Sequence, residues 1–442
     1  MTTSLAYQPE LFPVGAPEDP SHARYNGRSG AFGDNMSLGV HRWYRYSAGF
    51  SAEWVRWLLR ERRGDDTMTV LDPFAGVGTA LLACDAEGVN SIGFEPHPFV
   101  HRIARAKLRG IHADLDELRR TFADFIERVD AAEQAPPSGD VPKLLQKCYT
   151  AESLAELNAA RQVFVRDFED GSPASELLWL AITAVLRSCS GAGTAQWQYV
   201  LPNKSKAAVS KPMHALEAKA REMLEDVDHA QRNGWAALGS ILRTDARAPN
   251  AGELPGLVDA VVTSPPYPNN YDYADATRLE MTFWGEVSGW GDLQDRVRRH
   301  LIHSCSQHTA AERLQLDTLL SDAAVGPIRP ELAEACGVLA EIRETKGGRK
   351  SYHTMAAAYF RDLALVFRQL RRLCRPGAWM CFVIGDSAPY GVYLSVDEWL
   401  GRLAEAEGFP SFRFEKIRDR NVKWKNRKHR VPLKEGRLWI QG

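Results

Sequence analysis

The sequence predicts an α/β fold built on one mostly parallel sheet. Strand-like runs such as "MTVLDPF" (68–74) and "LVDAVV" (257–262) alternate with helix-like runs, a pattern typical of βαβ units. A glycine turn follows the first of these strands and leads directly into a helix-like stretch. The chain of 442 residues is long enough for one large domain with insertions, or for two domains.

The composition is that of a soluble globular protein, with 44% hydrophobic and 25% charged residues. The start, "MTTSLAYQPE", lacks the basic residues and apolar run of a signal peptide. The longest apolar run, "LLWLAITAVL" (177–186), is too short to span a membrane. We therefore expect a cytoplasmic protein without a membrane partner.

Seven scattered cysteines include no CxxC pair, which predicts reduced thiols rather than disulfides or a zinc ribbon. The stretch "HSCSQH" (303–308) offers three side chains that could bind a metal. No second cluster with metal-ligand spacing accompanies it. We expect no metal.

The elements follow in order from the N-terminus. Residues 1–37 are rich in Gly, Pro, Ser and Asn, and we expect a partly ordered arm. A helix is predicted over 50–64, capped by Ser51 and ended by Gly64. The strand 68–74, a glycine turn with its helix and a second strand over 90–96 come next.

Residues 111–239 read as a helical insertion, with a linker at 134–142. Strands resume at 241–245 and 257–266, and a variable region covers 286–351. A long helix then ends at "RPG" (375–377), before a strand over 379–386. The segments "FRFEKI" (412–417) and "RLWIQ" (437–441) are expected to pair antiparallel.

The glycine turn lies in "VLDPFAGVGTAL" (70–81), at the edge of a parallel sheet where ligands bind. A P-loop is excluded here because no GK[ST] follows. A dinucleotide site would place a third glycine at position 81, which is Leu81. A nucleoside without phosphates is the remaining ligand class, and S-adenosylmethionine (AdoMet) is its common case. Glu95, at the end of the second strand, would then accept hydrogen bonds from the ribose. A purely structural turn stays open as an alternative.

The stretch "TSPPYPNNYDY" (263–273) directly follows a strand-like run. The exocyclic amine of a nucleic-acid base is a poor nucleophile, because its lone pair is delocalised into the ring. Acceptors for the amine protons would free that lone pair, and the Ser264 hydroxyl and Pro265 carbonyl are suitable. Pro265 and Pro266 would hold the carbonyl rigidly, and Tyr267 offers a flat face to a base extruded from its stack. A proline-rich turn with a core tyrosine is the alternative.

Together, "DPFAGVGT" (72–79) and "SPPY" (264–267) resemble the signature motifs of AdoMet-dependent DNA amino-methyltransferases, which make N4-methylcytosine or N6-methyladenine. "HRWYRYSAGFSAEWV" (41–55) and "RTDARAPN" (243–250) are similar to further motifs of this family. The resemblance implies a seven-stranded Rossmann-like sheet, AdoMet as cofactor and double-stranded DNA as substrate. It also makes a cognate restriction endonuclease a candidate partner.

Carried onto this sequence, the resemblance assigns the catalytic corner to Ser264, Pro265, Pro266 and Tyr267. It places AdoMet against Phe50, Ser51, Asp72, Pro73, Phe74, Ala75, Gly76, Gly78, Thr79, Glu95 and Asp245. The serine before the prolines is commoner in cytosine-N4 enzymes than in adenine enzymes, so cytosine is favoured.

The implied catalytic core covers 38–110, 240–285 and 352–442. The segments 111–239 and 286–351 are both candidates for target recognition.

Four alternatives remain beside a cytosine-N4 enzyme. An adenine-N6 enzyme and an RNA base amino-methyltransferase share similar loops. A 5-methylcytosine enzyme typically carries its nucleophile in a Pro-Cys pair, which this sequence lacks. A catalytically inactive DNA-binding protein would bind no AdoMet.

The segment "KIRDRNVKWKNRKHR" (416–430) is strongly basic, whereas the whole chain has a net charge of −1. Such a block on an otherwise acidic protein predicts a polyanionic partner. We expect DNA phosphate contacts from Lys423, Lys425, Arg427, Lys428 and Arg430. A solvated hairpin tip is the alternative.

Overall fold

The structure is a computed structural model, and it describes residues 32–46, 49–62, 67–133, 141–195, 199–249, 256–420 and 431–442. Of the predicted N-terminal arm only 32–37 is described, and it forms the short helix η1 (Phe32–Ser37). A second short helix, η2, covers His41–Trp43. In the described part of the chain, no helix is both long and apolar enough to cross a membrane.

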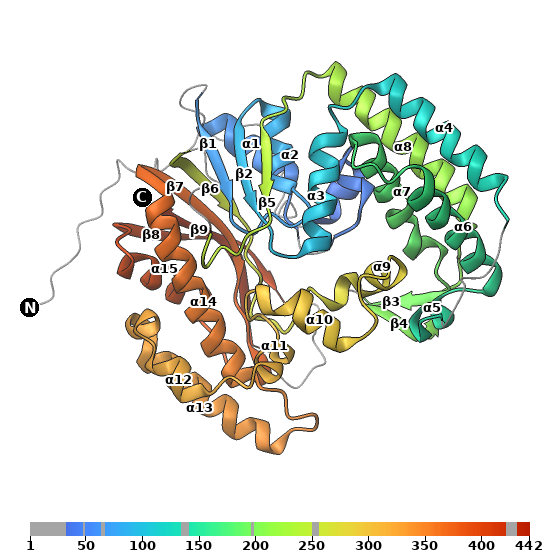
Figure 1. The fold of residues 1–442 in the computed structure, drawn as a ribbon. Coiled ribbons are helices and arrows are strands. Elements are labelled where there is room, and N and C mark those ends of the chain that lie inside the picture. The colour runs from blue at the N-terminus through green and yellow to red at the C-terminus, as the bar shows by residue number, and fades with distance from the viewer. Residues whose placement is uncertain are drawn as a thin grey trace, which may run out of the picture.

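A seven-stranded, mostly parallel sheet forms the centre of the molecule, as the sequence predicts (Figure 1). Its order is β5 (Gly239–Leu242), β2 (Asn90–Phe94), β1 (Thr69–Asp72), β6 (Val258–Thr263), β7 (Cys374–Gly385), β9 (Leu433–Gln441) and β8 (Ser411–Arg420). β9 runs antiparallel to both β7 and β8, which confirms the predicted terminal pair. The chain passes from β1 outward to β2 and β5, then returns to β6 on the other side. The carboxyl ends of β1 and β6 therefore frame the switch point at which ligands bind in such sheets.

Helices cover both faces of the sheet. One face carries α1 (Ala52–Arg62), α2 (Thr79–Glu87) and α3 (Pro98–Gly110), and the other carries α14 (Tyr352–Leu373) and α15 (Val396–Ala406) (Figure 1). Successive strand residues point to opposite faces, so Val70 joins one buried cluster and Leu71 the other. The central strands β1, β6 and β7 are mostly buried on both faces, whereas the edge strand β8 is charged and partly exposed.

Two further groups of elements extend from this core. The first follows α3 and comprises α4 (Leu115–Asp130), α5 (Lys143–Cys148), α6 (Ala151–Asp167), α7 (Pro173–Cys189), β3 (Ala192–Thr194), β4 (Val200–Ser205) and α8 (Pro212–Arg232). The second follows β6 and comprises η4 (Asp275–Thr277), α9 (Arg278–Phe283), α10 (Trp290–Arg296), η5 (Arg298–His300), α11 (Ser306–Ala311), α12 (Leu316–Ser321), η6 (Ala323–Ile328) and α13 (Arg329–Thr345). In Figure 1, α9 to α11 lie between the first group and the pair α12 and α13.

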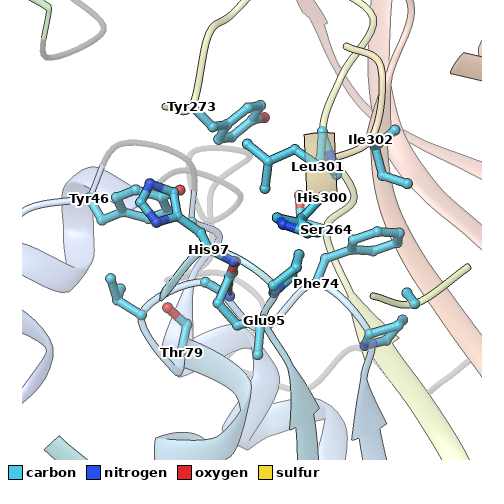
Figure 2. Close-up of a pocket in the computed structure, with 18 of the residues that line it drawn as sticks. Tyr46, Phe74, Thr79, Glu95, His97, Ser264, Tyr273, His300, Leu301 and Ile302 are labelled. Atoms are coloured by element: carbon cyan, nitrogen blue, oxygen red, sulfur yellow. Dashed lines mark hydrogen bonds between the residues drawn. The ribbon is translucent and has the colours of Figure 1, made fainter. Parts of the chain in front are cut away.

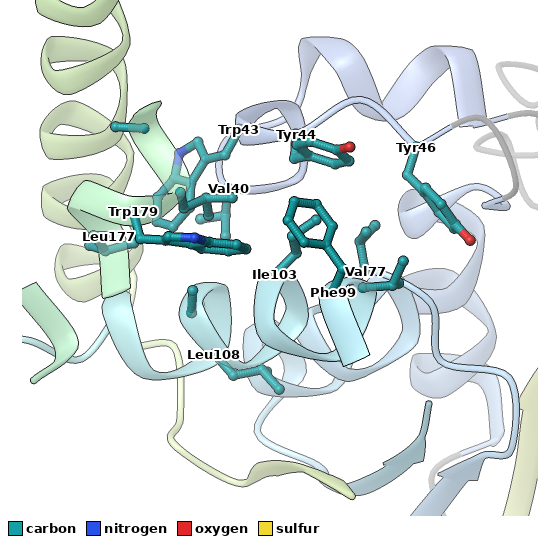
Figure 3. Close-up of a cluster of buried hydrophobic side chains, with 14 of the residues drawn as sticks. Val40, Trp43, Tyr44, Tyr46, Val77, Phe99, Ile103, Leu108, Leu177 and Trp179 are labelled. Atoms are coloured by element: carbon teal, nitrogen blue, oxygen red, sulfur yellow. The ribbon is translucent and has the colours of Figure 1, made fainter. Parts of the chain in front are cut away.

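The segment before α1 joins the first group to the core. Trp43 is fully buried and packs with Phe99 of α3 and Trp179 of α7 in one cluster (Figure 3). Asp226 of α8 accepts hydrogen bonds from the Trp43 indole (2.8 Å) and from the Arg42 guanidinium (2.7 Å). This packing fixes the chain that leads to Tyr46 and Phe50.

Two details differ from the sequence-based expectations. The long helix α14 ends at Leu373, just before "RPG" as expected, but the strand that follows starts earlier than 379: β7 begins at Cys374 and contains "RPG". The insertion is not wholly helical either, because β3 and β4 form a small antiparallel sheet. Both strands are short, so neither shows the alternating pattern by which a strand is recognised in a sequence.

Candidate active site

A cavity lies at the carboxyl ends of β1, β2 and β6 and holds about 780 Å³ of space not filled by protein atoms, part of it open to solvent (Figure 2). Its walls bring together residues far apart in sequence. They are Tyr46, Gly49, Phe50, Pro73, Phe74, Ala75, Gly76, Val77, Thr79, Glu95, Pro96, His97, Asp245, Ala246, Ser264, Pro266, Tyr273, His300, Leu301 and Ile302.

The glycine turn after β1 forms the floor of this cavity. Gly76 has φ 54° and Gly78 has φ 86°, both in the left-handed region that glycine adopts without strain. A Cβ on Gly76 would approach the Tyr46 ring to 3.4 Å. The backbone thus faces the cavity closely and then enters α2.

Glu95 lies at the end of β2 and closes one side of the turn. Its two carboxyl oxygens accept the backbone N–H groups of Gly76 (3.0 Å) and His97 (2.8 Å). Burial raises the pKa of this carboxyl to about 8, although the two N–H donors act in the opposite direction. Each oxygen keeps a second lone pair, and the side chain lines the cavity, so it can accept hydroxyl donors from a ligand.

Asp72 does not line the cavity but holds its two motifs together. Its Oδ1 accepts the Phe74 N–H (3.0 Å) and the Thr263 hydroxyl (2.5 Å). Thr263 directly precedes Ser264, so this one carboxyl joins the glycine turn to the proline corner. Burial raises the pKa of Asp72 to about 7.

Ser51 and Gly78 are also absent from the cavity wall among the described residues. The Ser51 hydroxyl instead accepts the Trp54 N–H at 3.3 Å, at the start of α1. Gly78 precedes α2, and a Cβ there would lie 3.5 Å from Ala104 of α3.

The proline corner after β6 meets the glycine turn across this cavity, since Ser264 and Pro266 line its wall. The Ser264 hydroxyl donates to the Val383 carbonyl of β7 at 3.2 Å. Its proton is therefore directed into the sheet, and its oxygen can accept a hydrogen bond, for which the Tyr267 hydroxyl also competes. A hydroxyl at this place on the cavity wall can accept a hydrogen bond from an amine.

Among the described residues, Pro265 and Tyr267 line neither this cavity nor the second cavity described below. The Arg420 guanidinium lies 5.4 Å from the centre of the Tyr267 ring. Burial raises the pKa of Tyr267. The sequence-based hypothesis that Tyr267 stacks on a base remains a prediction.

Asp245 lines the cavity but is held from outside it. Arg247 donates to both of its oxygens (3.0 and 2.6 Å) and also to Asp362 of α14 (2.9 Å). Asp362 in turn forms a hydrogen bond of 2.7 Å with Nδ1 of the His303 ring. This buried network raises the pKa of His303 to about 9, through its hydrogen bonds to Asp362 and Glu312, against the effect of burial.

Several wall residues were missed by the sequence reasoning. His300, Leu301 and Ile302 come from 286–351, which was treated only as a candidate recognition region. His97 is buried, and desolvation lowers its pKa to about 3, so its ring is neutral. Its position directly after "GFEP" is a signal that could have found it, whereas 300–302 carry no recognisable motif.

A second cavity is lined in part by the residues that follow the proline corner. It is lined by Tyr199, Asn269, Asn270, Tyr271, Tyr352, Ser387, Ala388, Pro389, Tyr390, Arg420 and Leu433. Four of these residues are tyrosines and two are asparagines, so the wall offers aromatic faces together with amide groups. The two ends of the β8–β9 connection, Arg420 and Leu433, both lie on it.

The stretch 303–308 does bring possible metal ligands together, as Asp272, Cys305 and His308 are close and buried. The Asp272 carboxylate, however, already accepts two Arg298 donors (3.1 and 2.6 Å) and the Ala274 N–H (3.1 Å). A guanidinium bound to the same carboxylate disfavours a cation there. All seven cysteines lie in the described chain, and all are buried and free.

The predicted phosphate-binding residues Lys423, Lys425, Arg427, Lys428 and Arg430 lie outside the described residues. They remain a prediction from the sequence.

The chain is similar to curated Type II methyltransferases over most of its length. M.BsoBI of Geobacillus stearothermophilus is 26% identical over 90% of this chain and 84% of that protein. M.AvaI of Nostoc sp. is 25% identical over 86% of this chain and 81% of that protein. M.MjaII of Methanocaldococcus jannaschii is 33% identical, over 20% of this chain and 16% of that protein.

No protein-family model and no solved structure matches the chain. The relatives and the Rossmann-like fold together indicate S-adenosylmethionine as the methyl donor.

Proposed function

We propose that the protein is a site-specific DNA methyltransferase that moves a methyl group from AdoMet to the N4 amine of cytosine. The observation that carries this proposal is the position of Ser264, which lines the same cavity as the glycine turn and Glu95. The similarity to Type II methyltransferases supports DNA as the substrate. The serine in place of aspartate supports cytosine over adenine.

The residues that line the cavity suit AdoMet in their chemistry. Phe50, Phe74, Leu301 and Ile302 give it apolar walls for an adenine ring. The unused lone pairs of Glu95 suit the two ribose hydroxyls. Bound AdoMet would supply an electrophilic methyl group on a sulfonium, which needs no covalent help from the protein.

The protein's part in the reaction is then to prepare the amine. The Ser264 oxygen accepts one of its protons as a hydrogen bond, so that the nitrogen can direct its lone pair at the methyl group. The Pro265 carbonyl, which the sequence suggests for the second proton, is not part of the cavity wall. The carbon–sulfur bond breaks as the carbon–nitrogen bond forms, and the extra amine proton leaves to solvent. Asp72 keeps the two motifs in register through Phe74 and Thr263.

The second cavity supports a nucleic-acid substrate beside these atoms. Base–aromatic stacking contributes about 1–3 kcal/mol per base and tolerates any base. Tyr199, Tyr271, Tyr352 and Tyr390 therefore make this wall a suitable place for a nucleotide that has left the duplex.

Product identification tests the proposal directly. DNA from cells that express the protein is digested to nucleosides and separated by mass spectrometry, beside DNA from cells that express Ser264→Ala. N4-methylcytosine should appear in the first sample alone. N6-methyladenine would move the target to adenine, methylated RNA without methylated DNA would change the substrate class, and no methylated nucleoside would favour an inactive binding protein.

Direct transfer makes a second prediction. No stable adduct should form with DNA that carries 5-fluorocytosine at the target, because no cysteine nucleophile attacks the ring. Denaturing gels of the reaction with AdoMet check this, with a known 5-methylcytosine enzyme as positive control. A band that survives denaturation would contradict direct transfer.

Glu95 predicts a pH-dependent affinity for AdoMet. Burial gives this carboxyl a pKa near 8, so much of it is protonated at pH 7. Ribose hydroxyls bind the carboxylate more strongly than the acid, so binding should tighten as the pH rises through 8. Calorimetry from pH 6.5 to 9 on the wild type and on Glu95→Gln measures this.

The variant separates this effect from the titration of the ligand's own amino group, which is identical in both proteins. Glu95→Gln should bind about tenfold or more weakly at pH 8.5, from the loss of charge-assisted hydrogen bonds. Its affinity should also change less with pH than that of the wild type. Equal pH profiles would place the ribose contact elsewhere.

A further inference from the structure

The segments 111–239 and 286–351, whose roles the sequence left open, meet at Asp272. This residue lies in the loop that follows the proline corner, called the catalytic loop below. Asp272 follows the proline corner by a few residues and is 2% exposed. Its backbone N–H donates to the Tyr199 hydroxyl at 2.5 Å, from the β3–β4 hairpin. Its carboxylate accepts the Arg298 guanidinium at 2.6 Å, from the region after α10. Both groups therefore hold the same point of the loop.

Tyr199 is presented to the loop from a fixed position. Its carbonyl accepts the Ala195 N–H at 2.8 Å, which closes the hairpin just before β4. Its ring packs against Tyr271, with 5.3 Å between the centroids. Tyr199 is thus held in place both by its backbone and by its ring.

The helices behind the hairpin are also fixed to the segment that follows the loop. Arg187 of α7 donates to Glu280 of α9 at 2.5 Å and to the Ala276 carbonyl. Glu280 is fully buried, so this ion pair is costly to break. A displacement of the helical group would therefore be transmitted to the loop through Tyr199 and through Arg187.

We propose that Tyr199 is a positioning residue of the methyl-transfer reaction. Its hydroxyl places the catalytic loop through Asp272 and makes the helical group 111–239 a working part of the active centre. This inference rests on the proposed function. It also assigns the hairpin a role that does not require it to contact the cofactor, since Tyr199 is absent from the cofactor cavity wall.

Tyr199→Phe removes only the hydroxyl and keeps the ring against Tyr271. The loop N–H then loses its acceptor, and the loop gains freedom near Ser264. We expect kcat on the cognate DNA to fall about 10- to 100-fold, the scale of a buried donor left without a partner. AdoMet affinity, and the KM for DNA to within about threefold, should stay unchanged.

Tyr149→Phe is a matched control from the same helical group. Its hydroxyl donates to the Leu186 carbonyl at 2.9 Å, a hydrogen bond within that group rather than to the loop. It should lose stability by a similar amount and keep the wild-type kcat. Melting curves of both variants place any general loss of stability on one scale.

Single-turnover rates decide between positioning and mere stability. Slow transfer in Tyr199→Phe beside a normal rate in Tyr149→Phe supports the proposal. Equal rates in all three proteins, or equal losses in both variants, overturn it. Failure of the wild type to methylate DNA would instead defeat the proposed function, so the two outcomes are distinct.

Discussion

Replacing Ser264 with alanine is expected to lower kcat by about 10²- to 10³-fold, the scale for removing one preorganised hydrogen-bonding group from an active site. The wild-type hydroxyl donates to the Val383 carbonyl, and its oxygen lines the cavity as a hydrogen-bond acceptor. Alanine removes an acceptor that the amine needs only as its nitrogen becomes nucleophilic. The loss should therefore appear in kcat rather than in the KM for DNA.

Two measurements accompany this variant. Calorimetry should show AdoMet affinity within about twofold of the wild type, because other groups form most of the wall. Ser240→Ala is the matched control: this serine lies on β5, and its hydroxyl donates to the Ser91 carbonyl at 3.4 Å. It should leave kcat unchanged. A Ser264→Ala enzyme with near wild-type kcat would remove Ser264 from the chemistry.

The sequence predicts the fold well because the strands that form it are strongly patterned. β1, β2 and β6 are short apolar runs next to glycine or proline corners, and parallel sheets bury both faces of such runs. The glycine turn and Glu95 could be named for the same reason. They follow those strands directly, so the position of the strand end fixes theirs.

The residues that sequence reasoning missed share the opposite property. His300 and Ile302 reach the cavity from a region without regular spacing, and their place depends on the His303–Asp362 contact across the fold. Tyr199 lies in a hairpin and contacts Asp272, which is 73 residues further along the chain. Such contacts are set by tertiary packing, which no local pattern encodes.

Asp72 shows a second limit of sequence reasoning. Its place at the end of β1 suggested ligand contact, yet its carboxyl faces inward and joins Phe74 to Thr263. Position at a strand end predicts proximity to the site, but the direction of the side chain depends on which partner satisfies it. Here the neighbouring strand offers a hydroxyl at 2.5 Å.

Neutralising the basic block should have the largest effect on DNA binding. A variant with Lys423, Lys425, Arg427, Lys428 and Arg430 all changed to glutamine is expected to lose affinity for every DNA sequence alike. Its salt slope should flatten by about 0.9 unit for each phosphate contact removed. The methylated sequence should not change, because phosphate contacts carry no base information.

The described ends of this connection give the prediction its place. β8 ends at Arg420 and β9 begins at Leu433, and both residues line the second cavity. The block is thus tethered at both ends beside the wall proposed for an extruded nucleotide.

A matched pair of variants isolates position from net charge. The first pair, Lys423→Gln with Lys425→Gln, removes two charges from the block. The second pair, Arg372→Gln with Arg375→Gln, removes two charges near the start of β7, at the opposite end of the strands. Binding assays from 50 to 300 mM salt should show a shallower slope for the first pair alone. An unaltered slope in the first pair and in the five-residue variant would mean that the block is a solvated tip without contact to DNA.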